Sequence, residues 1–245
     1  MSSVTSQAVL RRPRAFLGVS GPDAEDYLQR MVSNDVAALA AGDACDALLL
    51  TAKARIIAPL RIVRRANDDF LVLTEPELGE VVRSQLLRAR FAAKVAIEQE
   101  EHESWLVLGG DEVVDERPPG EEASEEEFER RRIESRVPRW GHELDDRVLP
   151  AEAGLEETHI SFSKGCYPGQ EPIARQHYRG KVNRRLRVLD VDGEVEPGDE
   201  LTVDGKTVGR ITSAVPGVAL AYVRVEVPDD AALVTGARHA RMRPA

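Results

Sequence analysis

The stretch that decides the fold is KGCYPGQE, residues 164–171, which carries a cysteine between two glycines. Gly165 and Gly169 permit tight or unusual backbone angles. A helical run starts at the end of this stretch, and Gly180 suits its C-terminal stop. The thiol of Cys166 is therefore predicted to lie just before a helix N-terminus, where exposed N–H groups favour an anion.

Two features around this thiol bear on its reactivity. A nearby lysine and a helix N-terminus both lower the pKa of a cysteine, and Lys164 supplies the first. Glu171 acts in the opposite direction. A buried structural thiol is the other reading of Cys166, because cysteine is among the most buried residue types. Both readings stay open for Cys166, whereas Cys45, at a strand start, is predicted to be structural.

Composition restricts the class of protein. The chain has 245 residues with 42% hydrophobic and 31% charged residues, so it should fold around a core. Its net charge of −10 argues against nucleic acid and anionic membranes as direct partners. Only two cysteines occur, and no apolar run reaches signal-peptide or membrane-span length, which predicts a cytoplasmic protein.

The N-terminal part alternates strand and helix patterns, which indicates an α+β fold. A capping box with an early proline is predicted over 74–77. The expected strands are 16–19, 47–51, 55–63, 70–74, 94–97 and 105–108, and the expected helices are 24–32 and 78–89.

The remaining chain changes character twice. Residues 111–129 are acidic and predict a solvated loop, within which Ser124 and Glu127 can cap a helix that starts there. From 187 to 243, short alternating runs separated by turns predict a small β-barrel or sandwich, with a hairpin at Asp204-Gly205. Three parts result: residues 1–110, an α+β part; 111–185, the acidic loop, helix and cysteine segment; and 186–245, a β-barrel.

The cysteine motif, followed by Ala174-Arg175 and Arg179-Gly180, resembles the signature of the YgfZ family. That family is related to the T-protein, the aminomethyltransferase of the glycine cleavage system. Weaker matches occur in the expected order along nearly the whole chain. They cover residues 21–24, 33–36, 48–56, 141–144, 150–155 and 208–213.

The resemblance implies an aminomethyltransferase-like fold of three parts around a central hole that holds tetrahydrofolate or a derivative. It also implies a role in making or repairing iron–sulfur proteins, and indirectly in tRNA modification. Cys166 and Lys164 are then the expected working residues. The residues that support this motif are Gly165, Tyr167, Gly169, Gln170, Glu171 and Arg175.

Folate contacts are carried over from the same resemblance. Arg132 lines up with an arginine near the T-protein folate, where a guanidinium suits a carboxylate. Trp140 lines up with a tyrosine that could stack on the ring system. Asn34 and Arg55 complete the expected folate-binding set.

One departure from the T-protein bears on activity. The strand that carries an Asp-Asp pair in the T-protein has Ala58 and Pro59 in this chain. Neither side chain can accept a proton or orient an amine, so we predict no glycine-cleavage activity. The histidines match no compact zinc pattern, and no metal site is predicted.

Three functions remain open at this point. The first is a monomeric, folate-binding accessory protein that works with iron–sulfur proteins or their assembly machinery. The second is a folate-dependent one-carbon or aminomethyl transferase acting on an unknown substrate. The third is a non-catalytic interaction module that keeps the fold without the ligand. Whether the chain is an enzyme is left undecided by the sequence.

Overall fold

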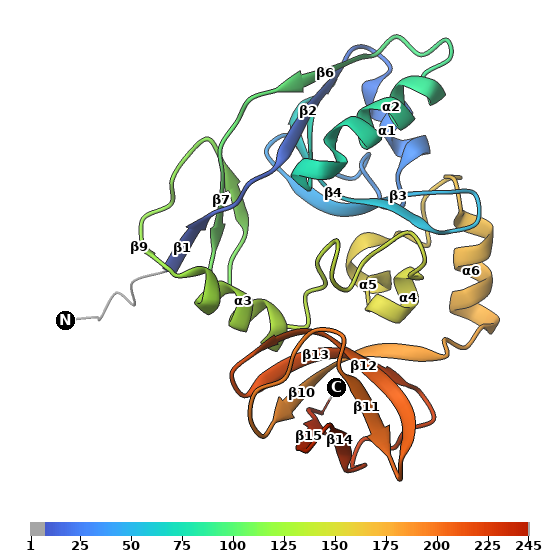
Figure 1. Cartoon of the computed structure of the whole chain (residues 1–245). Helices are drawn as coiled ribbons and strands as arrows, with labels where there is room; N and C mark the ends of the chain where they lie inside the picture. The colour runs from blue at the N-terminus through green and yellow to red at the C-terminus, as the bar shows by residue number, and fades with distance from the viewer. Residues whose placement is uncertain (1–7, 245) are drawn as a thin grey trace. The chain divides into compact units, whose positions relative to one another are not determined.

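The computed structural model describes residues 8–244, and contacts group the chain into two compact units. The barrel unit combines Met1–Arg12, Ser104–Leu144 and Val182–Ala245. The sheet unit combines Pro13–Glu103 with Asp145–Lys181. Each unit therefore draws on segments that lie far apart in the sequence, as the colours of Figure 1 show.

An antiparallel sheet with the strand order β3-β4-β5-β2-β6 forms the centre of the sheet unit. Burial alternates along β4, as expected for a strand with one face in a core. The predicted strands of this region are confirmed with small shifts at their ends. Their bounds are β2 (Ala15–Ser20), β3 (Ala44–Leu50), β4 (Ile56–Ala66), β5 (Asp69–Thr74) and β6 (Ala96–Glu100).

Two helices, α1 (Ala24–Met31) and α2 (Gly79–Ala89), pack on this sheet. They lie side by side, because the hydroxyl of Tyr27 in α1 donates a hydrogen bond to the carbonyl of Leu86 in α2. A short 3-10 helix, η1 (Pro76–Leu78), precedes α2.

The predicted capping box over 74–77 is wrong. The hydroxyl of Thr74 donates 2.9 Å to the carbonyl oxygen of Pro59 in β4, and no side chain caps η1. Thr74 is fully buried at the end of β5, so its hydroxyl bonds to the neighbouring strand and does not reach the helix start. Tertiary pairing has thus overridden a local capping pattern.

Three further helices complete the sheet unit: α4 (Pro150–Ala153), α5 (Glu156–His159) and α6 (Gln170–Arg179). α5 contacts β3. Gly180 is the C-cap of α6, as the sequence predicts.

The barrel unit contains a closed barrel with the strand order β10-β13-β12-β11-β14-β15. Its core is apolar, with Leu189, Leu201 and Leu233 completely buried. The hairpin at Asp204-Gly205 is confirmed: both residues have positive φ, 49° and 75°, as a type I′ turn requires. The strands are β10 (Arg184–Val191), β11 (Glu200–Val203), β12 (Lys206–Val215), β13 (Val218–Arg224), β14 (Leu233–Thr235) and β15 (Arg238–Met242).

A second sheet, β8-β7-β1-β9, lies in the same unit. Its strands are β1 (Ala8–Arg11), β7 (Ser104–Val107), β8 (Glu112–Val114) and β9 (Glu121–Glu122). The prediction of a loop throughout 111–129 is therefore partly wrong. Backbone pairing of β8 with β7 and of β9 with β1 orders these short acidic segments despite their charge.

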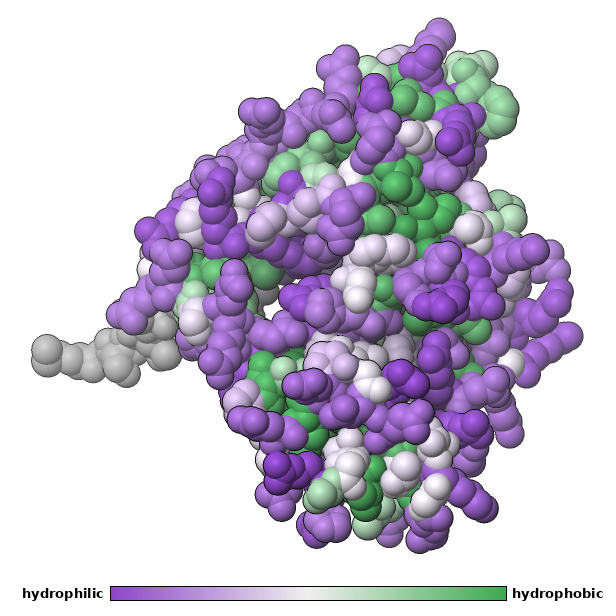
Figure 2. All heavy atoms as spheres, viewed as in Figure 1, coloured by the Kyte–Doolittle hydropathy of each residue, from purple (hydrophilic) through white to green (hydrophobic). Residues whose placement is uncertain are grey.

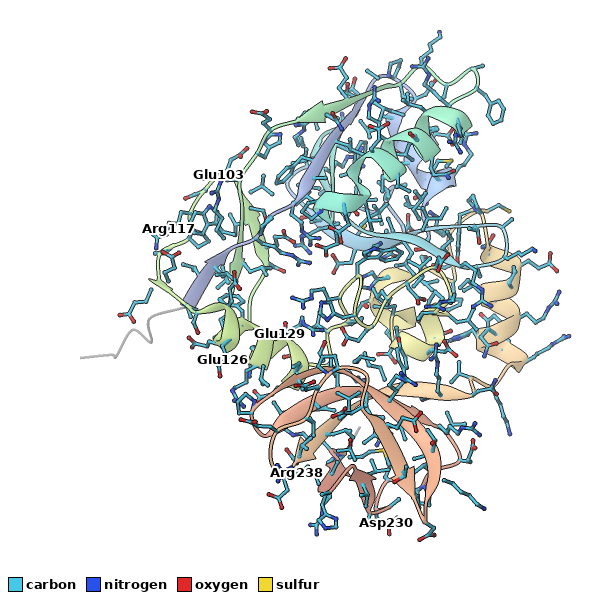
Figure 3. The ribbon with its side chains drawn as sticks, in the orientation of Figure 1. Glu103, Arg117, Glu126, Glu129, Asp230 and Arg238 are labelled. Atoms are coloured by element: carbon cyan, nitrogen blue, oxygen red, sulfur yellow. The ribbon has the colours of Figure 1, made fainter. Side chains whose placement is uncertain are left out.

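Helix α3 (Glu125–Glu134) follows β9. Its predicted cap is confirmed, because the Ser124 hydroxyl accepts a hydrogen bond from the N–H of Glu127. α3 packs against β12 and β13 of the barrel. Figure 3 labels Glu126 and Glu129 on this helix, and Arg117, whose guanidinium carbon lies 5.3 Å from the centre of the Trp105 ring.

Together, the mainly antiparallel sheets and the packed helices give the α+β class that the sequence predicts. Hydrophilic side chains cover most of the face shown in Figure 2, in keeping with the 31% of charged residues. No helix in the described range is long and apolar enough to cross a membrane.

Candidate functional site

Cys166 lies in the loop that joins α5 to α6, in the sheet unit. Its side chain is exposed. Gly169 is the N-cap of α6, so the predicted placement of the thiol just before a helix N-terminus is confirmed. A thiol in this position is open to solvent and to a partner.

The side chain of Lys164 runs inward from the same loop. The residue is only 8% exposed, and its Nζ donates hydrogen bonds of 2.7 Å to the carbonyl oxygens of Val32 and Asn34. Burial lowers the pKa of Lys164 to about 8, while the charges of Asp35 and Cys45 act in the opposite direction. The ammonium group thus holds the cysteine loop against the turn that follows α1.

Further hydrogen bonds join these two segments. The N–H of Ser161 donates 3.0 Å to the carbonyl of Ser33, and the Ser33 hydroxyl donates 2.6 Å to the carbonyl of His159. The side-chain amide of Asn34 donates to the carbonyls of Asp46 and Thr158. The structure therefore brings Lys164 and Asn34 together, in one anchored junction.

Tyr167, next to the thiol, is buried, and its ring centre lies 5.4 Å from the Lys164 ammonium. Burial raises the pKa of Tyr167 to about 12. The phenol is therefore neutral at physiological pH, and the aromatic face contributes a cation–π contact to the junction.

The two glycines of the motif differ. Gly169 has a φ of +85°, and a Cβ at this position would lie 2.7 Å from the carbonyl oxygen of Thr51. Gly165 has no positive φ, and a Cβ there would meet no atom within 4 Å. Of the two glycines that permit unusual backbone angles, Gly169 adopts a positive φ and Gly165 does not.

The remaining motif residues lie in the first turns of α6. The N–H of Gln170 donates 3.2 Å to the carbonyl of Tyr167, which closes the turn into the helix. Glu171 and Arg175 form an ion pair of 2.9 Å with side chains 84% and 72% exposed. Such an exposed pair adds little stability, so Arg175 remains available for other contacts.

Arg55 and the strand that follows it belong to the sheet unit. The guanidinium of Arg55 donates a hydrogen bond to the carbonyl oxygen of Arg147. In β4, Ala58 is fully buried and Pro59 is half-buried. Neither residue type has a carboxylate.

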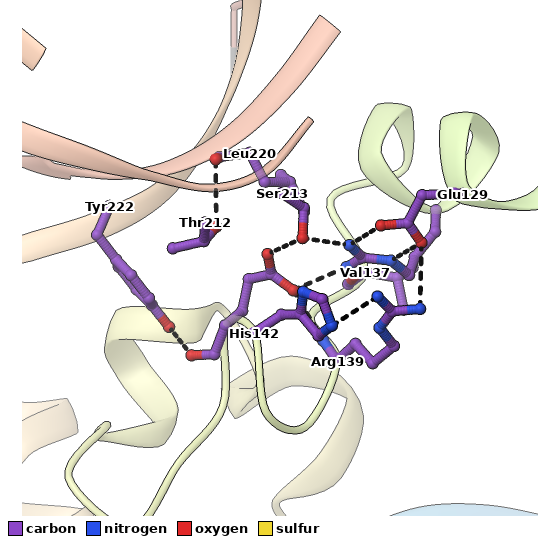
Figure 4. Close-up of polar contacts among 10 residues, drawn as sticks. Glu129, Val137, Arg139, His142, Thr212, Ser213, Leu220 and Tyr222 are labelled. Carbon is purple, nitrogen blue, oxygen red and sulfur yellow. Dashed lines mark hydrogen bonds and ion pairs between the residues drawn. The ribbon is translucent and has the colours of Figure 1, made fainter. Parts of the chain in front are cut away.

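Arg132 lies in α3 of the barrel unit, and all five of its N–H hydrogens are used within the protein. Figure 4 labels three of the residues that accept them, Glu129, Val137 and Ser213. Two bonds go to Glu129, at 2.8 and 2.7 Å. The others go to the Val137 carbonyl at 2.6 Å, to Glu143 at 2.8 Å and to the Ser213 hydroxyl at 2.6 Å. A clamp by Arg132 on a folate carboxylate does not fit this geometry, because no donor is left for it.

Glu143 is the buried centre of this network and was not singled out from the sequence. Its side chain has no exposed surface, and it accepts hydrogen bonds from Arg132, from the Ser213 hydroxyl at 2.6 Å and from the N–H of Arg139 at 3.1 Å. The hydroxyl of Tyr222 donates 2.9 Å to the Glu143 carbonyl. The only sequence signal was its place in the matching stretch 141–144.

Trp140 lies in the tight turn that Glu143 closes. The N–H of Gly141 donates to the carbonyl of Leu144, and Gly141 has a φ of +79°. Trp140 is half-buried, so its ring keeps some surface for stacking. Arg132 and Trp140 are thus linked through Glu143, with the arginine supporting the turn that carries the aromatic ring.

A second group that the sequence did not indicate lies beside the cysteine loop. The rings of Phe162 and His177 stack at 4.0 Å, and Tyr178 contacts both rings edge-on. Phe162 lies in the loop and His177 in α6, so the sequence did not indicate that their rings would stack. Among residues 8–244, no three His, Cys, Asp or Glu side chains are grouped as a metal site requires.

The fold is of the aminomethyltransferase type. The structure matches the glycine cleavage system aminomethyltransferase T of Bartonella henselae with a TM-score of 0.78 and 16% identity, over 96% of this chain and 84% of that one. Residues 183–245 match the C-terminal beta-barrel domain of CAF17.

Sequence relatives define the group more closely. The tRNA-modifying protein YgfZ of Edwardsiella ictaluri is 26% identical over 89% of this chain and 84% of its own length. The human mitochondrial iron–sulfur cluster assembly factor IBA57 is 34% identical over 49% and 36%. An aminomethyltransferase of Rippkaea orientalis is 27% identical over 86% of this chain and 50% of its own length. The homologues thus include YgfZ, IBA57 and aminomethyltransferases, and the resemblance predicted from the sequence is confirmed.

Proposed function

We propose that this chain is a folate-binding accessory protein for iron–sulfur cluster assembly or repair, with Cys166 as its working residue. The observation that carries the proposal is the exposed Cys166 thiol on a loop anchored by the buried Lys164. Relatives named as an iron–sulfur cluster assembly factor and a tRNA-modifying protein support it.

The surroundings of Cys166 suit a thiol that meets a large partner. A thiolate is the nucleophilic and metal-binding form of cysteine, and soft thiolates bind iron–sulfur clusters. Because the loop is fixed by hydrogen bonds to the turn after α1, the thiol is held in place before a partner arrives. Iron or a cluster would be cargo in this role.

Tetrahydrofolate or a derivative is the proposed ligand, on the strength of the aminomethyltransferase and YgfZ relatives. We assign Trp140 as the aromatic side chain on which the folate ring stacks. We assign Arg132 as the residue that supports the turn carrying Trp140. Asn34 has both amide hydrogens engaged, so its contribution would come through the junction it forms with Lys164. We place the protein in the cytoplasm as a monomer, with an indirect effect on tRNA modification.

Complementation of a deletion strain tests the role of the thiol. The readout is the activity of a reporter iron–sulfur enzyme, with Cys45→Ser as the matched control. We expect Cys166→Ser to lose rescue while Cys45→Ser keeps it, with both proteins present at wild-type levels. Full rescue by Cys166→Ser would show that the thiol is not the working group.

A calorimetric titration with tetrahydrofolate tests the ligand separately. We expect wild type and Cys166→Ala to bind it alike, because the thiol serves a later step. Trp140→Ala should weaken binding, since stacking on an aromatic ring contributes about 1–3 kcal/mol per base in comparable platforms. Absence of binding to the wild type would remove the folate part and leave a protein-interaction role.

A folate-dependent one-carbon transferase is the second candidate, favoured by the match to aminomethyltransferase folds. Against it, Ala58 and Pro59 leave β4 without a general base. The proposal therefore includes no glycine-cleavage activity. Tetrahydrofolate-dependent ammonia release at normal turnover in a reconstituted assay, or a new folate product detected by mass spectrometry, would favour the transferase.

A further inference from the structure

An open cleft of about 480 Å³ lies in the sheet unit, along one face of α6. Its volume falls in the range of roughly 300–1,000 Å³ that is typical of small-molecule sites. Residues of α6 that line the cleft, such as Pro172, Arg175 and Arg179, are three or four positions apart, so one face of this helix forms a wall of the cleft. The lining residues are Ala54, Leu149, Pro150, Ala151, Glu156, Pro172, Ile173, Arg175, Gln176, Arg179 and Gly180.

The floor of this cleft is apolar. Ala54 and Ile173 are buried, with 2% and 4% of their surfaces exposed, and Pro150 is also buried. Leu149 and Pro172 are half-buried beside them. An aliphatic or aromatic body seated on this floor would remove the exposed parts of Leu149 and Pro172 from water.

Two guanidinium groups belong to the same wall. Arg179 is exposed, and no residue between 8 and 244 forms a hydrogen bond or ion pair with its side chain. Arg175 has only its exposed pair with Glu171, an interaction that water screens strongly. Residues four apart on a helix are neighbours, so both groups can reach a single anion.

Among the described residues that line the cleft, Glu156 has the one carboxylate, and it lies beside His177. Its oxygen is 3.4 Å from the ring nitrogen Nδ1, a contact that becomes an ion pair when the imidazole is protonated, whereas the two arginines are always charged and outnumber this carboxylate. Gln176, between the two arginines on α6, adds an amide that can donate to an acceptor. The polar side of the cleft is therefore suited to an anionic group.

We propose that this cleft binds a small organic anion, a carboxylate or phosphate ester carried on an apolar body. Arg179 and Arg175 hold the anionic group, and Ile173 and Pro150 contact the body. This proposal does not rest on the folate proposal, since none of the expected folate residues, Arg132, Trp140, Asn34 and Arg55, lines the cleft. It also gives the arginines that follow the cysteine motif a function of their own.

The test is a titration of the full chain followed by NMR of the Ile173 methyl group. The probes are benzoate and phenyl phosphate, with uncharged benzamide for contrast. We expect a saturable shift with the two anions, and the tighter of them identifies the head group. Arg179→Gln and Arg175→Gln should each raise Kd about five- to tenfold, the size of one lost charged contact at a solvent-exposed site.

The matched control is Arg30→Gln. Arg30 also forms an exposed ion pair with an acidic residue one turn earlier, Asp26, but does not line the cleft. Its substitution changes the net charge equally and should leave Kd unchanged. Lack of a saturable shift, equal binding of benzamide, or equal effects of Arg30→Gln and Arg179→Gln would each overturn the proposal.

Discussion

The two cysteines of this chain have opposite surroundings, and their reactivity should differ accordingly. Cys166 is exposed, whereas Cys45 is half-buried in β3, where burial and then the charge of Asp46 raise its pKa to about 11. At pH 8, only about one Cys45 thiol in a thousand is then ionised. We expect iodoacetamide to modify Cys166 well before Cys45, as measured by peptide mass spectrometry. Faster labelling of Cys45 would contradict the structure.

Lys164 should make stability depend on pH above neutrality. Its pKa in the folded protein, about 8, is below the ordinary 10.5, so the unfolded chain binds more protons between these values. The free energy of unfolding attributable to this residue therefore rises from pH 8 toward 10.5, and its destabilising effect is complete below pH 8.

Urea unfolding at pH 7.5 and 9.5 measures this dependence. We expect the wild type to gain stability over this interval relative to Lys164→Met, which has no titrating group at the position. Cys45 and Tyr167, whose pKa values are raised to about 11 and about 12, act in the opposite direction as the pH rises. Both are present in the two proteins, so the comparison with Lys164→Met isolates the lysine. Parallel pH profiles for the two proteins would rule out a buried ammonium.

The same lysine shows what a sequence can indicate about a site. Its closeness in sequence to Cys166 favoured electrostatic support of the thiol, and that role stays a prediction. The structure instead directs the ammonium to carbonyls at Val32 and Asn34, more than a hundred residues earlier. Contacts of that separation depend on tertiary packing, which residue spacing does not encode.

At the scale of elements, the start of α6 depends on Gly169. A side chain there would need a φ of +85° and would bring Cβ within 2.7 Å of the Thr51 carbonyl and 3.1 Å of the Ala54 Cα. We expect Gly169→Ala to destabilise the protein by about 2–4 kcal/mol, from the sum of backbone strain and overlap.

Gly154 provides the control for that substitution. It has a similar φ of +76°, but a Cβ there meets no atom within 4 Å. Gly154→Ala should therefore cost only about 1 kcal/mol, the strain alone. Urea unfolding compares the two variants, and equal losses would show that the contact with the 51–54 turn is unimportant.

Long, strongly patterned elements could be predicted from the sequence, and short ones could not. The apolar spacing of α1 and the Asp-Gly hairpin between β11 and β12 specify their structures locally. β8 and β9 have three and two residues, too few for a period to show, and exist because β7 and β1 pair with them. The Thr74 hydroxyl likewise bonds to the neighbouring strand, although its local sequence matches a capping box.

At the scale of the molecule, the Arg132 network joins three parts of the barrel unit that are distant in sequence. Glu129 belongs to α3, Glu143 to the turn after it, and Ser213 to β12 of the barrel. Burial disfavours the charged guanidinium, but the hydrogen bonds that it donates to Glu129 and the charge of Glu143 outweigh burial and leave the pKa of Arg132 raised. From the sequence, Arg132 could only be assigned to a helix and aligned with a folate contact.

This network yields the strongest predicted effect on stability. Arg132→Met should lower the free energy of unfolding by about 3–5 kcal/mol, because it leaves the Glu143 carboxylate buried without its ion-pair partner. Glu143→Gln should cost less, since Arg132 keeps its ion pair with Glu129. The double variant should lose less than the sum, since neither charge remains. Arg175→Ala, which breaks only an exposed pair, should cost below about 0.5 kcal/mol. Urea unfolding of the four proteins measures the coupling, and additive losses would mean that Arg132 and Glu143 act independently.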